Sequence, residues 1–136
     1  MFGRDCPCGS GATYDACCGR LHRGNRTAGS PLELMRARYS AYVVGDADFV
    51  FATWHPRTRP DDVLLDPGLT WTGLAISGHG EDWVEFTASY LSRTGAGELH
   101  ERSRFEQRAG RWVYLDGETD PSDDAGDGAG DGAGDD

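Results

Sequence analysis

The apolar residues recur with a helical period in the first half of the chain and with a period of two in the second half. The helical pattern starts at Ser30, where a serine cap, a following proline and Glu33 together predict a helix start. This helix is expected to end at Gly45, and a second short helix to run from Asp46 to the residue before Pro56. The apolar face of the first helix is expected to comprise Leu32, Met35, Tyr39, Tyr42 and Val43.

The period of two predicts four strands, at residues 69–76, 83–91, 99–108 and 111–115. Glycine-bearing segments at 78–80, 95–97 and 109–110 separate them, and such short turns favour antiparallel hairpins over parallel crossovers. Helices followed by a meander of strands indicate an α+β fold, in which the helices cover one face of a curved sheet.

Composition divides the 136 residues into three segments. Residues 1–28 hold all four cysteines and little that could build a core, whereas residues 29–117 hold nearly all the aromatic residues and form the expected domain. Residues 118–136 contain eight of the 23 acidic residues and none of the 13 basic ones, which predicts a disordered acidic tail. The rest of the chain is nearly neutral, which excludes a strongly basic nucleic-acid binder, and a polyanion mimic, as the function of the whole protein.

The N-terminal segment has no apolar signal-peptide core, and no part of the chain is apolar over the length of a membrane span. We therefore expect a cytoplasmic protein without a membrane partner.

The four cysteines have the spacing C-x-C-x8-C-C, from Cys6 and Cys8 to Cys17 and Cys18. Four soft ligands in 13 residues suit one tetrahedral metal ion per chain. A complete sulfur shell leaves no position for water, which favours a structural over a catalytic ion. Four thiolates on a divalent ion carry a net negative charge, which nearby arginines are expected to soften. These are Arg4, Arg20, Arg23 and Arg26.

Two alternatives to this ligand set remain open at the level of the sequence. The first is a disulfide framework, although the Cys6–Cys8 and Cys17–Cys18 pairings would close strained rings and a cytoplasmic compartment is reducing. The second is that His22, four residues after Cys18, replaces Cys17 or Cys18 as the fourth ligand.

The cysteine segment resembles the SEC-C motif found at the C-terminus of the preprotein translocase motor SecA, in its residues Cys6-Pro-Cys-Gly-Ser-Gly11, Tyr14 and Cys17-Cys-Gly19. The chain from residue 5 to residue 117 further resembles the YchJ family (UPF0225). The segments that carry this second resemblance are 34–42, 46–48, 53–56, 101–105 and 110–117. The resemblance implies an NTF2-like domain, a cone of helices on a curved antiparallel sheet, with an N-terminal zinc knuckle. It also implies zinc, with iron as the alternative, at Cys6, Cys8, Cys17 and Cys18.

A polar pocket is expected inside the cone. The helical period places Arg36 within the apolar face of the first helix, and the strand period places Glu101 and Ser103 on the same side as Phe105. Arg36 and Glu101 would satisfy each other's charge. The candidate ligand-binding residues are Arg36, Tyr39, Trp54, His55, Glu101 and Ser103. The alternative, which the sequence favours, is a buried structural ion pair that closes the open end of the sheet.

No motif of a known catalytic class accompanies these residues, so the sequence assigns no catalytic residue. The function that it favours is a non-catalytic binding or adaptor module, whose knuckle docks on a protein or ribosomal partner. The alternative is a receptor or enzyme for a small ligand that binds in the cone. Both a monomer and a homodimer are compatible with the charged outer face expected for the sheet.

Overall fold

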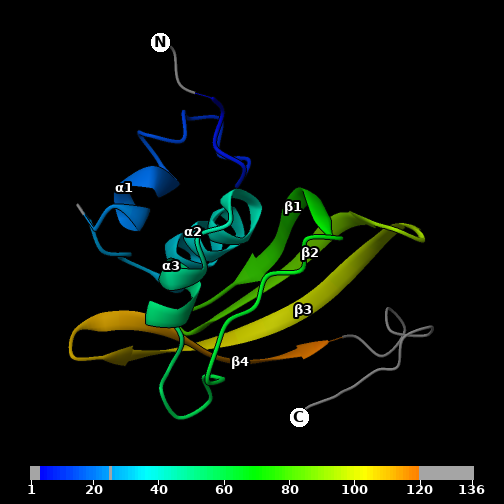
Figure 1. Ribbon diagram of the computed structural model, residues 1–136. Helices are drawn as coiled ribbons and strands as arrows, with labels where there is room; N and C mark the ends of the chain where they lie inside the picture. The colour runs from blue at the N-terminus through cyan, green and yellow to red at the C-terminus, as the bar shows by residue number, and fades with distance from the viewer. Residues whose placement is uncertain (1–3, 25, 120–136) are drawn as a thin grey trace.

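The computed structural model describes residues 4–24 and 26–119 of the chain. In these residues three helices precede four strands, which confirms the expected α+β order (Figure 1). The acidic tail predicted for residues 118–136 lies outside the described residues, apart from its first two residues, which belong to the last strand. The helices are α1 (Cys18–His22), α2 (Pro31–Val44) and α3 (Ala47–Ala52), and the strands are β1 (Thr70–His79), β2 (Trp83–Ser92), β3 (Gly95–Arg108) and β4 (Arg111–Thr119).

Local side-chain caps start α2 and α3, as the sequence predicts. The Ser30 hydroxyl accepts the backbone N–H of Glu33 at 3.1 Å, and the Asp46 carboxylate accepts a backbone N–H of α3 at 3.0 Å. The Glu33 carboxylate in turn accepts the N–H of Gly29 at 2.7 Å, so the capping box closes one residue before the cap. Gly45 ends α2 with a φ of 85°, a left-handed geometry that glycine adopts without steric cost.

The strands form one antiparallel meander in the order β1-β2-β3-β4. The turn predicted between the last two strands is confirmed, because Ala109 and Gly110 have φ values of 53° and 80°, which suit a tight hairpin.

The turn predicted at residues 95–97 is wrong, because these residues begin β3. Ser92 pairs with Gly95, so the chain reverses over the two residues between them. Gly97 lies opposite Tyr90, where a Cβ would come within 2.6 Å of the tyrosine hydroxyl. This glycine therefore makes room for a neighbouring aromatic side chain within the sheet.

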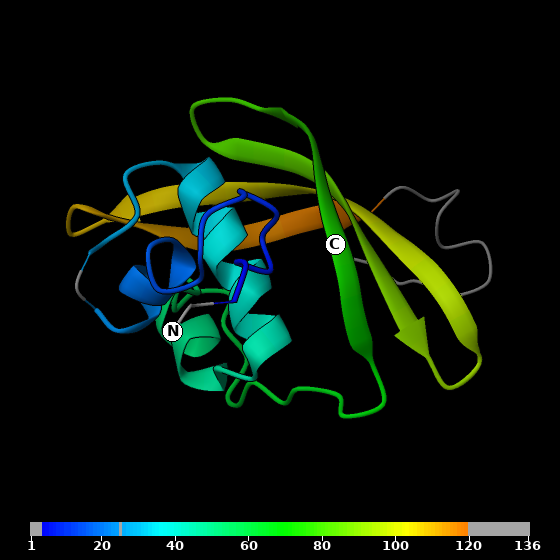
Figure 2. The same ribbon diagram turned by 90° about the horizontal axis from the view of Figure 1, so that it is seen from above.

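Helix α2 is the central layer of the molecule, between the sheet and the N-terminal segment (Figure 2). One side packs Leu34, Met35 and Tyr39 on a sheet core. The opposite side buries Ala37 among the cysteines and Leu21 of the N-terminal segment. Because two faces are buried, the predicted apolar face is only partly right: Met35 and Tyr39 lie in the core, whereas Val43 is 39% exposed. The sheet residues of this core are Val84, Phe86, Ala88 and Phe105.

The segment that leaves α3 covers the edge of β4. Tyr114 donates its N–H to the Thr53 carbonyl at 2.8 Å and accepts the N–H of His55 at 2.8 Å. These bonds satisfy backbone groups that an open edge strand would leave unpaired. They also bring Trp54 against the Tyr114 ring, at a centroid distance of 5.2 Å.

Candidate metal centre

Tight turns of the N-terminal segment bring its two cysteine pairs together. The N–H of Cys6 donates to the Ala12 carbonyl at 2.9 Å, and this closes a loop around Cys8. Two glycines within this loop, Gly9 and Gly11, have φ values of 84° and 90°. Residues other than glycine adopt this left-handed backbone geometry only at a cost in free energy, so the loop depends on glycine at these two positions.

The second cysteine pair lies where α1 begins. Gly19 donates its N–H to the Tyr14 carbonyl at 2.8 Å, and a Cβ on this glycine would come within 2.8 Å of the same oxygen. The close approach positions the turn that carries Cys17 and Cys18 towards the loop of Cys6 and Cys8.

The four sulfur atoms lie within 4.8 Å of one another, and all four cysteines are free. Cys17 Sγ is 3.7 Å from Cys8 Sγ and 4.0 Å from Cys18 Sγ. In a tetrahedral site with metal–sulfur bonds of ~2.3 Å, neighbouring sulfurs lie ~3.8 Å apart. The arrangement therefore fits one metal ion held by four thiolates. Within the knuckle, predicted at residues 1–28, such an ion would cross-link the loop of Cys6 and Cys8 to the start of α1.

Polar groups from α2 and from the knuckle surround the sulfurs. The Ser40 hydroxyl lies 3.6 Å from Cys6 Sγ, and the Ser10 hydroxyl lies 3.2 Å from Cys17 Sγ. Arg36 donates from Nη1 to the Cys8 carbonyl at 3.1 Å and lies 4.0 Å from its sulfur. Contacts of this kind orient and stabilise the thiolate ligands of structural metal sites.

The hydrogen bonds within the cysteine cluster favour the thiolate form of Cys8. A side-chain hydrogen bond from Cys18 is the main reason that the pKa of Cys8 is lowered to about 4, against burial, which raises it. The hydrogen bond to Cys8 and burial raise the pKa of Cys18, and burial raises that of Cys17. A metal ion would displace the protons of these thiols, so metal affinity is expected to rise with pH.

His22 is not a fourth ligand in this structure. Its Nδ1 is hydrogen-bonded to the Tyr14 hydroxyl, and its Nε2 donates to the Ala37 carbonyl of α2 at 2.8 Å. Its ring also packs on Phe49 of α3, at a centroid distance of 4.6 Å. His22 therefore connects the knuckle to α2 and α3.

The expected pairing of Arg36 with Glu101 is wrong. The guanidinium of Arg36 turns towards the knuckle, where it bonds to Cys8, and the arginine whose charge acts on Glu101 is Arg38 instead. Helical phase alone could not distinguish them, because both faces of α2 are buried. The spacing from Leu34 to Arg38 to Ala41 is the signal that would have placed Arg38 on a buried stripe.

Arg38 is 4% exposed and donates to the Val50 carbonyl at 2.9 Å and to the Thr53 hydroxyl at 2.8 Å. Its guanidinium lies over two aromatic rings, at 5.1 Å from the centroid of Trp54 and 4.6 Å from that of Tyr114. Ring faces attract a desolvated cation, so these contacts replace part of the lost hydration.

Glu101 is linked to this cation through Tyr114, whose ring lies under the Arg38 guanidinium and whose hydroxyl donates to the Glu101 carboxylate. Its Oε2 accepts hydrogen bonds from the Ser103 hydroxyl at 2.8 Å and from the Tyr114 hydroxyl at 3.0 Å. Burial raises the pKa of Glu101, while these two hydrogen bonds and the charge of Arg38 act in the opposite direction. A Cβ at Gly117 on β4 would overlap the carboxylate, so this geometry requires glycine there.

The other three candidate residues lie in separate surroundings. Tyr39 is 4% exposed and packs on Trp71, at a centroid distance of 6.3 Å. Trp54 contacts the Arg38 cluster, but its buried Nε1 has no hydrogen-bond partner in the described part of the chain. His55 Nε2 lies 3.4 Å from Glu106, away from the Glu101 carboxylate. Of the predicted pocket residues, the structure thus brings together Trp54, Glu101 and Ser103, with Arg38 and Tyr114 added.

The raised pKa of Glu101 predicts a specific pH dependence of stability. Below its unfolded pKa the side chain is protonated in both states, and as pH rises the unfolded state ionises first, which favours unfolding. We therefore expect the free energy of unfolding of wild type to fall relative to that of Glu101→Gln as the pH rises above about 4.5. Each tenfold difference in the proton affinity of Glu101 between the folded and unfolded states corresponds to a loss of about 1.4 kcal/mol. Urea unfolding of both proteins between about pH 4 and pH 7 measures the difference between their free energies of unfolding. Groups that titrate in the same way in both proteins do not contribute to this difference. A difference that stays constant over this interval would contradict the prediction.

The fold and the cysteine cluster together define a class of protein, in which a four-cysteine motif compatible with metal binding is joined to an NTF2-like domain. The model of the SEC-C motif matches residues 5–20, and that of the middle NTF2-like domain of YchJ matches residues 30–117. The chain belongs to the UPF0225 family. The expected family resemblance is thereby confirmed.

Relatives with curated sequences match nearly the whole described region. A UPF0225 protein of Streptomyces coelicolor is 51% identical over 120 residues, which cover 83% of this chain and 94% of the relative. A UPF0225 protein of Deinococcus radiodurans is 52% identical over 114 residues, which cover 83% and 88% of the two chains.

Two solved structures share the fold. The solution structure of a SEC-C motif containing protein from Rhodopseudomonas palustris has a TM-score of 0.72 and 36% identity, and the match covers 83% of this chain and 96% of that one. The crystal structure of a SEC-C motif containing protein from Psychrobacter arcticus has a TM-score of 0.69 and 27% identity, with coverage of 83% and 81%. Among the described residues, no helix combines the length and apolar character that crossing a bilayer requires.

Proposed function

We propose that this protein is a cytoplasmic zinc-binding module without catalytic activity, whose knuckle docks on a protein or ribosomal partner. The observation that carries the proposal is the set of four converging sulfurs, which would fill the coordination of a tetrahedral ion. Four thiolates suit zinc or iron, and zinc is the ion most often held in structural sites of this kind. Elemental analysis of the purified protein distinguishes the two metals.

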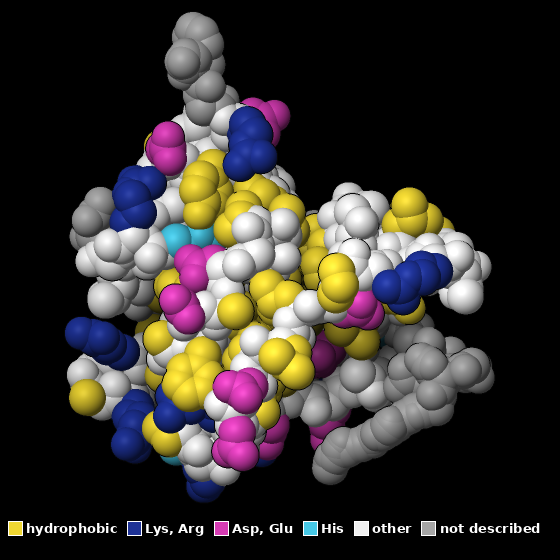
Figure 3. Space-filling view, in the orientation of Figure 1, with side chains coloured by type: hydrophobic (Ala, Val, Ile, Leu, Met, Phe, Trp, Pro, Cys, Tyr) yellow, Lys and Arg dark blue, Asp and Glu magenta, His cyan; other side chains and the backbone are white. Residues whose placement is uncertain are grey.

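The position of the knuckle supports a docking role. It stands on the side of α2 opposite the sheet (Figure 1), so a partner can approach it without disturbing the cone. Its surface combines basic, acidic and hydrophobic side chains (Figure 3), so a partner would find both charged and apolar groups on it. The cone would then serve as the rigid support of this surface.

The test is capture of partners by the full-length, metal-loaded protein from native lysate, together with co-sedimentation with ribosomes. We expect Cys17→Ser and a chelator each to abolish the enrichment seen with wild type. Glu101→Gln, which changes the cone and leaves the knuckle intact, is the matched control and should retain it. Equal capture by wild type and Cys17→Ser would overturn the proposal.

A second candidate function is binding of a small ligand in the cone. The buried Trp54 Nε1, which lacks a hydrogen-bond partner among the described residues, is the specific observation that favours it. A thermal-stability screen against a metabolite library tests this candidate. Ligand-dependent stabilisation that is lost in Glu101→Gln but kept in Cys17→Ser would support it over the docking role.

A further inference from the structure

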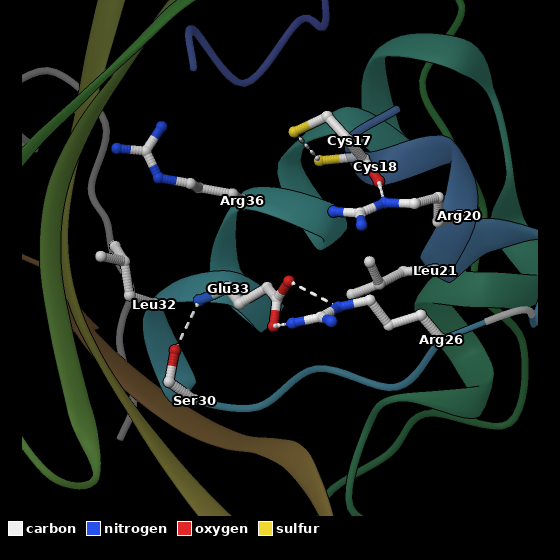
Figure 4. A pocket seen from close by; sticks show the side chains of 9 residues that line it. All are labelled: Cys17, Cys18, Arg20, Leu21, Arg26, Ser30, Leu32, Glu33 and Arg36. Atoms are coloured by element: carbon white, nitrogen blue, oxygen red, sulfur yellow. Dashed lines mark hydrogen bonds and ion pairs between the residues drawn. The ribbon is translucent and has the colours of Figure 1, made fainter. Parts of the chain in front are cut away.

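A cleft of about 360 Å³ lies between the knuckle and the N-terminal half of α2 (Figure 4). One wall comes from α1 and its cysteines, and the other from the first turns of α2. This volume lies at the lower end of the range found for ligand-binding clefts. The residues that line it are Cys17, Cys18, Arg20, Leu21, Arg26, Ser30, Leu32, Glu33 and Arg36.

Three arginines border this cleft, and they differ in how far their donors are used. Arg26 donates from Nε and Nη2 to both carboxylate oxygens of Glu33, at 3.2 and 3.3 Å. Arg36 is engaged with the Cys8 backbone and sulfur through Nη1. Arg20 donates only from Nε, to the Cys17 carbonyl at 3.3 Å, and its two terminal nitrogens have no hydrogen-bond partner within residues 4–24 and 26–119. Arg36 likewise keeps two nitrogens without a partner in this part of the chain, but its guanidinium is held against the Cys8 sulfur. Arg20 has no side-chain acceptor within hydrogen-bond distance, although its charge also acts on Glu33, so its terminal nitrogens are the donors of the cleft most available to a ligand.

Glu33, the carboxylate of the cleft, has little accepting capacity left. Burial raises its pKa, but the N–H of Gly29 and the charge and hydrogen bonds of Arg26 outweigh this effect and lower it. The carboxylate is thus ionised and already holds three donors. The cleft consequently offers more unused donors than acceptors, which is complementary to a ligand rich in acceptors.

We propose that this cleft binds an acidic side chain of a partner peptide, with the terminal nitrogens of Arg20 as its main contact. Planar guanidinium donors match the geometry of a carboxylate. Leu21 and Leu32 line the same cleft and supply apolar surface for a neighbouring side chain of the peptide. The ligand class is therefore a peptide segment in which an acidic residue has an apolar neighbour.

A nucleic acid fits this site less well than a peptide. A continuous phosphate backbone would bring several charges close to the ionised Glu33, whereas a peptide needs to bring only one carboxylate into the cleft. The nearly neutral body of the chain also lacks the strongly basic character that nucleic-acid binders use for long-range attraction. The apolar leucines have no counterpart on a phosphate chain.

The inference deepens the docking role proposed above, and rests on it, by naming the chemistry that the partner presents. Because Cys17 and Cys18 form part of one wall, the ion that holds these sulfurs would also hold the cleft in shape.

The experiment uses the metal-loaded, full-length protein and a fluorescein-labelled decapeptide of alternating leucine and glutamate, followed by fluorescence anisotropy. Arg20→Gln is expected to weaken binding at least about tenfold, as loss of a charge-assisted hydrogen bond does. Glu33→Gln is expected to tighten it about threefold, because it removes a like charge and keeps an acceptor for the helix cap. The Glu33 variant guards against misfolding, since a damaged protein does not gain affinity. Arg108→Gln, at the exposed end of β3, should leave binding within about twofold.

Three results would overturn the inference: no binding by wild type up to about 1 mM peptide, equal binding by Arg20→Gln, or equal binding of a peptide with glutamine in place of glutamate. Preferential binding of a labelled ten-nucleotide RNA would do the same. If partner capture still depended on Cys17 in that case, the docking role would stand without this cleft. If capture did not depend on Cys17 while the peptide still bound, the docking role would fail and the cleft would remain.

Discussion

Replacing Cys8 with serine is expected to abolish metal binding and to destabilise the knuckle. Cys8 is 1% exposed, and its sulfur lies 3.7 Å from that of Cys17. Serine cannot provide the soft thiolate that completes the tetrahedral set. When the free ion is present at 100 times its dissociation constant, its binding stabilises the folded state by about 2.7 kcal/mol. We expect Cys8→Ser to lose stability of this order. Elemental analysis and thermal unfolding with and without a chelator measure both effects.

Ser10→Ala is the matched control for this experiment. It removes the hydroxyl that lies 3.2 Å from Cys17 Sγ, yet leaves all four sulfurs in place. We expect this variant to keep one equivalent of metal and to lose no more than about 1 kcal/mol. The sheet core should survive in both variants, because its residues contact the other face of α2. A full equivalent of metal in Cys8→Ser would refute the assignment of the ligands.

Replacing Arg38 with alanine is expected to lower the free energy of unfolding by about 3–5 kcal/mol, the range for breaking a buried charged cluster. The change leaves the Val50 carbonyl and the Thr53 hydroxyl without their donor, and it opens a cavity between two aromatic rings. It also removes the cation whose charge favours ionised Glu101. Urea denaturation at neutral pH measures the loss.

Two comparisons make the result specific to the cluster. Arg108→Ala, in the exposed hairpin between β3 and β4, should change stability by no more than about 0.5 kcal/mol. Adding Glu101→Gln to Arg38→Ala should recover part of the loss, because a buried carboxylate would no longer be left without the charge of Arg38 that favours its ionised form. A loss below about 1 kcal/mol in Arg38→Ala would show that the cluster contributes little to the fold.

The parts of the fold that sequence reasoning predicted well are those set by neighbours along the chain. Ser30 and Asp46 cap their helices through residues three positions away, and this interaction needs no tertiary contact. The hairpin at Ala109 and Gly110 depends in the same way on the local backbone. Where a glycine serves a neighbouring strand instead, as Gly97 does for Tyr90, the local pattern led to a wrong turn.

The cysteine cluster is formed by residues close together in the sequence, whereas the interior of the cone is formed by residues far apart in it. Cys6, Cys8, Cys17 and Cys18 lie within 13 residues, so their spacing alone determined that one ion could be held between two short turns. Which arginine enters the cone was decided only by the tertiary structure. Because the knuckle covers one face of α2 and the sheet covers the other, both Arg36 and Arg38 meet buried surroundings. Helical periodicity distinguishes a buried face from an exposed one, but it does not tell two buried faces apart.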